Sequence, residues 1–457
     1  MAVPIAHVDV PAVDPPHSPG RERVVLFVLL GVGFMLSVDF SILNVALPQA
    51  GAGVELDRAD LAWITSAFAL PAAGFTLLFG RLGDLFGRRR LLLAGMVLLA
   101  GASTLGGFAA GPTTLLLART LQGFATAMAI PTAMSLLTTT FAEGTRRERV
   151  LGLNGALLCG GFTTGALVGG TLVTALGWRA AFFVNVPVAV AVLLVAPFVI
   201  TESRGSARAR LDVPGAVTVT GGLLAVVYAV TERNLGAAVA GVVLLAAFRR
   251  IELRATAPLV PPRILARPSV RWGNCAGLVT CGMVPAMIFL VTLYLQQVLD
   301  LSPLVTGLVF GVPGLASIAA GVVAGRVVGR FGNRVVLSVA MSLPGLATIP
   351  LVFVGADRLS LAIVVPALFV AFFGHVAAMV AYVVTGTSGL PNDEQGLATG
   401  LTSMTQQVAG AVGVPVLSAV AATQAVPLTG IHLALGVAVV VTLGGTALVW
   451  AGLRRSL

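Results

Sequence analysis

Long apolar runs alternate with short polar segments along almost the whole chain. A helix of about 20 apolar residues is long enough to cross the ~30 Å hydrocarbon core of a bilayer. The pattern therefore predicts an all-α membrane protein with fourteen transmembrane helices. The predicted spans are 24–48, 60–80, 91–110, 113–135, 147–173, 178–200, 212–231, 235–249, 271–296, 303–325, 335–354, 361–385, 396–421 and 430–453.

Composition supports the same class of protein. The 457 residues are 57% hydrophobic and only 10% charged, whereas a water-soluble fold carries about 25% charged residues. Because the apolar residues are spread over the whole length, the chain reads as a multi-pass membrane protein.

The arginines give the predicted orientation. With both termini in the cytoplasm, 23 of the 28 arginines fall in cytoplasmic segments and four fall in outer loops. Arg119 alone is left inside a span. Cytoplasmic loops are enriched in basic residues, and a wrong number of spans would scramble this alternation. We therefore expect a protein of the inner (cytoplasmic) membrane with cytoplasmic termini.

Two partners are not expected. The net charge of +10 comes from arginines in short loops, which is typical of membrane topology and not of a nucleic-acid-binding face. The chain has no lysine, so it lacks the lysine with which a Walker A loop holds ATP. Cys159, Cys275 and Cys281 lie in apolar surroundings and read as small core residues, so no metal or other cofactor is expected.

A charged, glycine-rich segment joins the second and third predicted spans. It reads Gly80-Arg-Leu-Gly-Asp84-Leu-Phe-Gly87-Arg88-Arg89-Arg90. Glycines let two helix ends approach and turn sharply, and Asp84 lies one turn from Arg88, near enough to pair with it. We expect a tight loop on the cytoplasmic side.

This segment resembles the loop between helices two and three of the major facilitator superfamily, of the form G-x-x-x-D-x-x-G-R-R/K. Gly80, Asp84, Gly87, Arg88 and Arg89 occupy the motif positions. The resemblance implies two six-helix bundles that expose a binding site alternately to the two sides. We hypothesise that Asp84 and the arginines latch the two halves on the inside when the site faces out.

The chain also looks repeated. Residues 325–334 are a degenerate copy of the glycine-rich segment without its aspartate, which predicts a second six-span unit. Two six-span units leave the seventh and eighth predicted spans as an inserted pair. With this pair the chain resembles the fourteen-span drug:proton antiporters, and the resemblance covers nearly all of 24–453. The predicted divisions are a disordered cytoplasmic tail 1–23, an N-terminal bundle 24–200, a linker with an inserted helix pair 201–270, a C-terminal bundle 271–453 and a cytoplasmic tail 454–457.

One acidic residue, Asp39, lies well inside a span. Its segment, Asp39-Phe-Ser-Ile-Leu-Asn44-Val-Ala-Leu-Pro48, resembles the first-helix motif of the fourteen-span family. Arg119-Thr-Leu-Gln122-Gly123 in the fourth span resembles the superfamily motif R-x-x-Q-G. At about 1.5 Å per residue, Asp39 and Arg119 lie at similar depth and can meet. Asp39 is either a structural acid or the proton-binding group; we favour the second, because intramembrane acids are usually functional.

The fifth span carries Gly152, Gly161, Gly165 and Gly169, spaced nine, four and four apart. The spacing resembles the antiporter motif of the family, which separates exporters from symporters, but Ala166 stands where the motif has proline. Small residues at every fourth position also allow close helix crossing, so packing alone is an alternative explanation for them. We therefore expect the protein to export its substrate. Because Ala166 replaces the motif proline, import stays an alternative.

Polar residues in or near the spans are candidates for lining a substrate cavity. They are Asn44, Gln122, Asn154, Tyr294, Gln297, His375 and Gln406. For His375 we favour a hydrogen-bonded interior histidine over a proton relay.

Together these features favour a proton-driven exporter of hydrophobic small molecules, neutral or cationic, that works as a monomer. A transporter of one specific metabolite is the alternative. A receptor-like or structural membrane protein is a further one, but it would need no titratable group such as Asp39 beside Arg119. An enzyme would need a polar catalytic set, and the sequence has none.

We predict that both termini are cytoplasmic and that the chain crosses the membrane fourteen times. Reporter fusions at each terminus, one active only in the cytoplasm and one active only outside it, measure this directly. An extracytoplasmic C-terminus would refute the arrangement.

Overall fold

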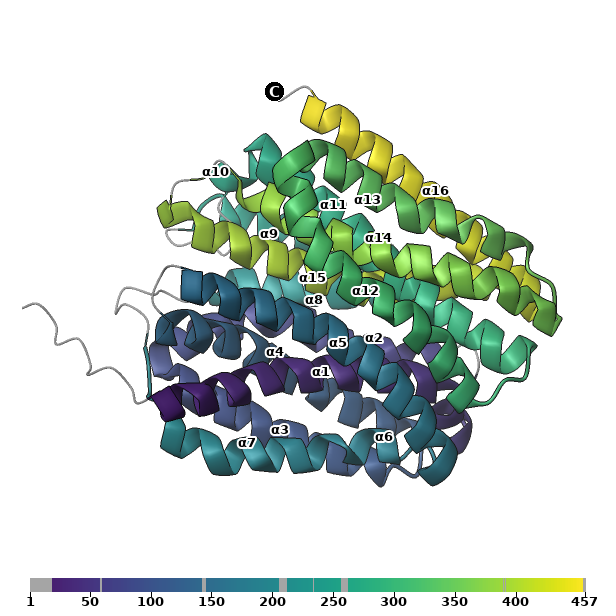
Figure 1. Cartoon of the computed structure of the whole chain (residues 1–457), viewed down its shortest axis with the longest axis horizontal. Helices are drawn as coiled ribbons and strands as arrows, with labels where there is room; N and C mark the ends of the chain where they lie inside the picture. Colours follow the sequence, from purple (N-terminus) through teal and green to yellow (C-terminus); the bar gives the residue numbers. More distant parts are fainter. Residues whose placement is uncertain are drawn as a thin grey trace, which may run out of the picture.

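The protein is a bundle of long, antiparallel helices (Figure 1). The computed structural model describes residues 19–57, 60–141, 145–204, 212–232, 234–255, 262–388, 390 and 392–454. No β-strand occurs in these ranges, which confirms the all-α class. Ten described helices are long and apolar enough to cross a membrane, or eleven if the bent α2 counts as one span. This establishes a multi-pass helical protein, and the count of fourteen crossings stays a prediction.

Every predicted span nevertheless falls on a helical segment. The first half holds α1 (Pro19–Gly53), α2 (Leu61–Phe86), α3 (Arg88–Gly107), α4 (Pro112–Thr140), α5 (Thr145–Leu176), α6 (Ala180–Phe183) and α7 (Asn185–Val199). Then come α8 (Val213–Thr231), α9 (Leu235–Glu252) and the short α10 (Pro262–Leu265). The second half holds α11 (Pro268–Leu293), the π-helical η2 (Tyr294–Val298), α12 (Pro303–Phe331), α13 (Asn333–Thr348), η3 (Pro350–Phe353), η4 (Arg358–Ser360), α14 (Leu361–Thr387), α15 (Asn392–Ala421) and α16 (Pro427–Arg454).

Several helices extend beyond the predicted spans, because polar residues at their ends remain helical. α1 begins at Pro19, within the predicted tail 1–23, and residues 1–18 of that tail lie outside the described residues. Proline is well suited to a first helical turn, where its missing N–H is not needed. α16 likewise continues into Arg454.

The predicted loop between the second and third spans shrinks to one residue. α2 continues to Phe86 and α3 begins at Arg88, so Asp84 is helical and only Gly87 turns the chain. Gly87 has a φ of 116°, a conformation that glycine alone adopts at little cost. Gly332, at the matching turn between α12 and α13, has a φ of 80°.

The two halves repeat one set of helix neighbours. In the first half α1 packs on α5, α2 on α4, and α3 on both α4 and α7. In the second half α11 packs on α15, α12 on α14, and α13 on both α14 and α16. Between the halves, α5 packs on α12 and α2 on α15, again as an equivalent pair. This internal repetition agrees with the degenerate copy of the glycine-rich segment.

The two halves share a large apolar cluster at one end of the bundle. We call the end where α1 begins and α16 ends the termini side, and the opposite end the far side. On the far side one apolar cluster runs through both halves and includes Ile42, Ala166, Phe289 and Phe310. On the termini side the described core residues form separate clusters, one in the first half around Leu92 and the others outside it.

Specific contacts reinforce the far side. Gln296 donates from Nε2 to the Val45 carbonyl at 2.8 Å, which joins η2 to α1. The Leu304 amide donates to Thr174 Oγ1 at 3.1 Å, which joins α12 to α5.

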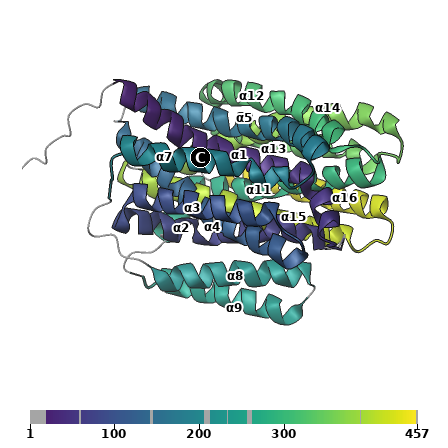
Figure 2. The ribbon, with the colours of Figure 1, turned by 90° about the horizontal axis from the view of Figure 1, so that it is seen from below.

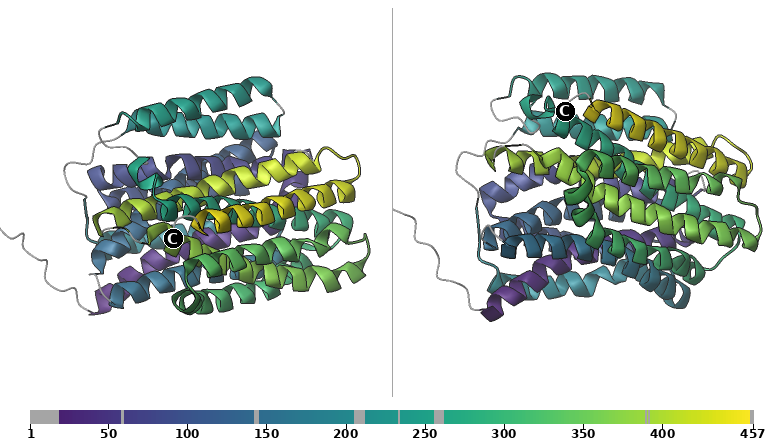
Figure 3. Two further views of the ribbon diagram at one scale, coloured as in Figure 1. Left: turned by 90° about the horizontal axis from the view of Figure 1, so that it is seen from above. Right: turned by 45° about the horizontal axis from the view of Figure 1, so that its top comes forward.

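The pair α8 and α9 lies along one flank of the bundle (Figures 2 and 3). α8 packs on α2 of the first half and on α15 of the second. Its start is capped: Asp212 accepts a bond from the Gly215 amide at 2.9 Å, and Pro214 stands in the first turn. Thr220 Oγ1 donates to the Gly74 carbonyl of α2 at 2.9 Å.

The glycine spacing in α5 produces close contact with α1. A Cβ on Gly165 would lie 2.7 Å from the Val38 carbonyl, and one on Gly161 would lie 2.8 Å from the Phe34 carbonyl. A Cβ on Gly169 would lie 2.9 Å from Ile42 Cα. Gly152 lies in α5, but its contacts are outside the described residues. Glycine therefore lets the two backbones meet along the segment of α1 that holds Asp39.

This packing makes Gly165→Ala destabilising. The added methyl group must displace the α1 backbone, and overpacking of this kind costs roughly 1–3 kcal/mol. Thermal unfolding of the purified protein in detergent should show a lower Tm. Gly160→Ala is the matched control, because a Cβ there meets nothing within 4 Å; it should keep or raise the Tm. Equal Tm values for the two variants would contradict the role of Gly165.

Candidate functional site

A buried charge pair lies inside the first half. Asp39 of α1 is 1% exposed and Arg119 of α4 is 2% exposed. Arg119 Nη1 lies 3.5 Å from Asp39 Oδ2, so the two predicted partners do meet. The pairing is loose, since this nitrogen donates to Gln122 Oε1 at only 2.7 Å. Asp39 therefore depends on more than the arginine for its hydrogen bonds.

Arg119 is held from several directions. Its Nε donates to the Ile64 carbonyl of α2 at 3.1 Å, and its guanidinium lies 4.4 Å from the centre of the Phe68 ring. A guanidinium over an aromatic face gains a cation–π attraction. Gly123 brings α4 this close to α2, because a Cβ there would overlap the Phe68 carbonyl.

Two further polar residues complete the cluster. Asn185, the first residue of α7, donates from Nδ2 to Asp39 Oδ1. The same nitrogen lies 3.3 Å from Ser103 Oγ of α3, which also accepts from Gln122 Nε2 at 2.9 Å. Ser103, Gln122 and Asn185 are all 0% exposed. Side chains from α1, α3, α4 and α7 thus form one buried polar network around the carboxylate.

Sequence reasoning found Asp39, Arg119 and Gln122 but missed Ser103 and Asn185. Asn185 follows the break between α6 and α7, and Pro187 nearby lacks the N–H that would continue the helical hydrogen bonds from α6. The signal was the one amide inside the apolar run 178–200, and for Ser103 the adjacent hydroxyls of Ser103 and Thr104 inside 91–110.

The charged turn at the termini side is tied to its own half. Asp84 Oδ1 accepts from Arg88 Nε at 2.9 Å and from Nη2 at 2.8 Å. Glu202, after α7, accepts from the backbone amides of Arg89 at 3.0 Å and Arg90 at 3.2 Å. A carboxylate at these free amides caps the first turn of α3 and suits its positive end.

A further bond holds this turn to the end of α7. Arg89 Nη1 donates to the Ile200 carbonyl at 3.0 Å. In the described residues no hydrogen bond or ion pair joins the side chains of Asp84, Arg88 or Arg89 to the second half. The described contacts of this turn thus lie within the first half, and the latch between the halves stays a hypothesis.

The other candidate cavity residues do not gather at one place. Asn44 donates to the Phe40 carbonyl of its own helix at 2.8 Å, and Asn154 faces Gly33 of α1. Tyr294 donates from its hydroxyl to the Gly355 carbonyl at 2.6 Å on the far side. Gln296, not Gln297, makes the bond between halves.

The remaining candidates are histidine and glutamine side chains of the second half. His375 in α14 has a buried Nδ1 without a hydrogen-bond partner in the described structure. His432 in α16, which the sequence reading passed over, approaches the Val354 carbonyl at 3.0 Å through Nε2. Gln406 is partly buried in α15.

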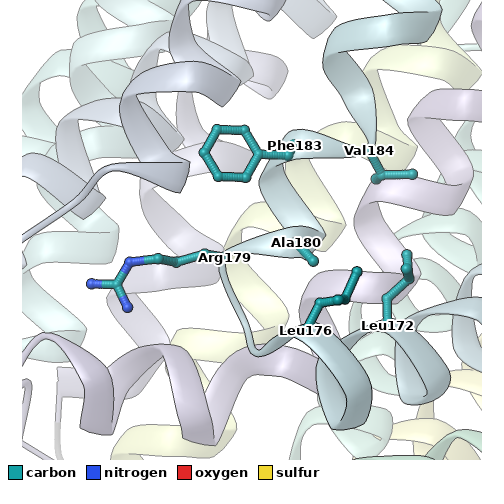
Figure 4. Close-up of a pocket in the computed structure, with 6 residues that line it drawn as sticks. All are labelled: Leu172, Leu176, Arg179, Ala180, Phe183 and Val184. Carbon is teal, nitrogen blue, oxygen red and sulfur yellow. The ribbon is translucent and has the colours of Figure 1, made fainter.

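A surface pocket of about 540 Å³ lies at the far-side end of α5 and α6, apart from the Asp39 network. Leu172, Leu176, Arg179, Ala180, Phe183 and Val184 line it. Figure 4 shows the Arg179 guanidinium extending away from Leu172 and Leu176. No member of the charge network contributes to its wall.

The bundle and its repeated halves match solved transporters. The chain superposes on the nucleoside transporter NupG with a TM-score of 0.68 over 94% of this chain and 99% of that one, at 10% identity. It superposes on the human organic anion transporter MFSD10 with a TM-score of 0.66 over 94% and 100%, at 17% identity. These likenesses show the fold.

The sequence pattern of the Major Facilitator Superfamily matches residues 29–414. The chain belongs to this superfamily. It is therefore a multi-pass membrane transporter of small molecules and not an enzyme, as the sequence predicted.

Curated superfamily members resemble it over most of their length. The puromycin resistance protein pur8 of Streptomyces alboniger is 35% identical over 408 residues, which cover 86% of this chain and 81% of that protein. The cephamycin export protein CmcT of Amycolatopsis lactamdurans is 36% identical over 399 residues, covering 84% and 82%. The tetracenomycin C resistance and export protein of Streptomyces glaucescens is 31% identical over 415 residues, covering 87% and 76%.

We predict that Asp84→Asn reduces transport while the protein stays folded and inserted. The change removes the charge that holds Arg88 and would hold a partner in another conformation. Initial rates of transport in vesicles, normalised to the amount inserted, measure it. Glu202→Gln is the comparison variant: it weakens the cap of α3 and should lower the Tm. Full transport by Asp84→Asn would remove the latch from the mechanism.

Proposed function

We propose that the protein exports hydrophobic small molecules, of the drug or antibiotic type, across the cytoplasmic membrane in exchange for protons. The observation that carries this proposal is the buried acid Asp39, 3.5 Å from Arg119 within a closed polar network. A charge in the apolar centre of a transporter is costly unless it is paired, and such residues usually serve the transported ion or substrate.

The pair is chemically suited to binding and releasing a proton. Arginine keeps its charge at physiological pH, so Arg119 acts on the carboxylate and does not itself carry the proton. Removal of water favours a protonated carboxyl group, whereas a nearby cation favours the ionised form. A movement that changes the separation of the pair, or its access to water, therefore changes how tightly Asp39 holds a proton.

The fold supplies such a movement. α4 packs on helices of its own half and α1 mainly so, while far-side contacts of α1 such as that of Val45 with Gln296 cross between halves. If the termini are cytoplasmic, a conformation joined on the far side would open its binding site to the cytoplasm. Rocking of the halves would then break the far-side contacts and bring the termini sides together, where Asp84 and Arg88 lie.

The names of the similar proteins support the substrate class. Relatives that share about a third of their residues with this chain are named for puromycin resistance and for export of cephamycin. For this protein we propose the general substrate class, hydrophobic or amphipathic antibiotics. We do not propose puromycin or cephamycin itself as the substrate. A cationic substrate would compete with the proton for Asp39 directly, since both are attracted to the carboxylate.

The remaining assignments belong to the same proposal. The chain would cross the membrane fourteen times with both termini in the cytoplasm and work as a monomer. Residues 24–200 and 271–453 would form the moving halves, and the inserted pair within 201–270 would flank them. The glycines of α5 would support export by keeping α5 rigid against α1.

Transport of one specific metabolite is the second candidate, and drug susceptibility separates the two. A host without its own pumps, with and without this protein, is exposed to chemically unrelated antibiotics. Export of drugs raises the inhibitory concentration of several hydrophobic compounds. Unchanged inhibitory concentrations throughout the panel would favour the metabolite transporter.

We predict that Asp39→Asn keeps some substrate binding but abolishes uphill export driven by a pH gradient. The amide preserves the shape of the carboxyl group and cannot bind and release the proton. Proteoliposomes with an imposed pH gradient measure accumulation of a drug to which the protein confers resistance.

Asp357→Asn is the matched control, an acid-to-amide change outside the network at the start of η4. It should accumulate drug as the unsubstituted protein does. If Asp39→Asn still concentrates drug against its gradient, the proton site lies elsewhere and Asp39 is structural.

A further inference from the structure

The amide of Asn185 has one of its two polar atoms unused. Nδ2 donates to Asp39 Oδ1 and lies within reach of Ser103 Oγ, whereas Oδ1 is buried and has no partner among the described residues. Buried acceptors are nearly always paired, so an exception calls for an explanation. Here the unused acceptor belongs to a residue that already touches the titratable carboxyl group.

A proton on Asp39 would change what its neighbours must provide. An ionised carboxylate only accepts hydrogen bonds, but a carboxylic acid has one O–H to donate. Both side chains that approach Asp39, Arg119 through Nη1 and Asn185 through Nδ2, present donors. Arginine has no acceptor atom, so it cannot receive the new hydrogen.

A half-turn of the Asn185 amide resolves this mismatch. The rotation exchanges Oδ1 and Nδ2 while leaving the shape of the side chain nearly unchanged. Oδ1 would then accept the Asp39 proton, and it would lie near Ser103 Oγ. A serine hydroxyl both donates and accepts, so Ser103 can switch from accepting the amide hydrogen to donating its own.

We propose that Asn185 is a positioning residue that holds Asp39 in both protonation states: it donates to the carboxylate through Nδ2 and, after rotation, accepts from the acid through Oδ1. The inference rests on the proposed proton-binding role of Asp39. It adds that the proton-bound state has a defined hydrogen-bond partner, and that this partner is set by α7.

No other charged group competes for this role in the described residues. α1 packs on α2, α4, α5, α6, α7, α11 and α12, and Arg119 is the charged side chain of these helices that contacts Asp39. The other charged residues described on those helices lie toward their termini-side ends: Asp84, Arg271, Arg326 and Arg330. The equilibrium between the ionised and the protonated form of Asp39 is therefore set by Arg119, Asn185 and the access of water.

Infrared difference spectroscopy of the purified protein tests the proposal. The carbonyl stretch of a protonated carboxyl group absorbs apart from the amide bands, and its frequency reports the hydrogen bonds of the acid. Spectra recorded over a pH series should show one acid band that is lost in Asp39→Asn, which assigns it. In Asn185→Leu the band should move toward the frequency of an acid without a hydrogen-bond acceptor.

The pH at which the band appears should change as well. Leucine removes both the donor to the carboxylate and the acceptor of the acid. Because a hydrogen bond to the charged form is the stronger of the two, the ionised form loses more, and the midpoint should rise by about one pH unit, a tenfold change in proton affinity. Asn185→Asp, which keeps the shape if leucine is not tolerated, should produce a second acid band, because two touching carboxyl groups do not both ionise readily. Asn274→Leu is the matched control, a buried asparagine of α11 bonded to Thr405 at 2.6 Å.

The outcomes separate this inference from the proposed function. An Asp39 band that keeps its frequency and midpoint in Asn185→Leu, or that moves equally in Asn274→Leu, overturns the role of Asn185 and leaves proton-coupled export standing. A midpoint that shifts at constant frequency overturns the rotation. If the Asp39 band depends on Asn185 but Asp39→Asn still exports drug against its gradient, the role of Asp39 in proton coupling is refuted. The hydrogen bond between Asn185 and Asp39 then stands.

Discussion

The buried pair of Asp39 and Arg119 constrains the whole first half of the protein. Removing one member of a buried charge pair typically costs about 3–5 kcal/mol, because the other is left uncompensated. Groups from several helices stabilise the two charges: a carbonyl and an aromatic face from α2, Ser103 from α3, Gln122 from α4 and Asn185 from α7. These helices must therefore keep their mutual positions for the charges to be tolerated.

Close backbone contact is what keeps them there. In a membrane the hydrophobic effect does not drive helices together, so they associate through packing and hydrogen bonds. The glycines of α5 lie against the α1 segment around Asp39, and Gly123 brings α4 against α2 beside Arg119. The two motifs that resemble signatures of a transport family thus have a direct physical effect: they set the distance between the helices that carry the charges.

The contact between the halves is organised differently. The described polar bonds of the Asp39 network all lie within the first half, whereas the two halves share an apolar cluster on the far side and a few bonds such as that of Gln296 with Val45. The charged turn at Gly87 is anchored to α7 through Glu202, within its own half. Rigid-body rocking requires halves that are stiff inside and an interface between them with few specific bonds, and this protein has that arrangement.

The sequence by itself determined the features that depend on position along a helix axis. Hydropathy determined the class of protein and where its helices lie, and the fixed rise of the helix brought Asp39 and Arg119 to one depth. It did not determine where helices end, because polar residues of α2 such as Asp84 continue the helix beyond the apolar stretch.

Only the tertiary structure decided which residues meet around an axis. Asn185 and Ser103 join Asp39, and Gln296 crosses to the first half while its neighbour Gln297 does not, because helix rotation and the choice of neighbour follow from packing. The depth of a residue in the membrane follows from its position along its own helix. The direction in which its side chain points around the helix axis depends on all the helices packed against it.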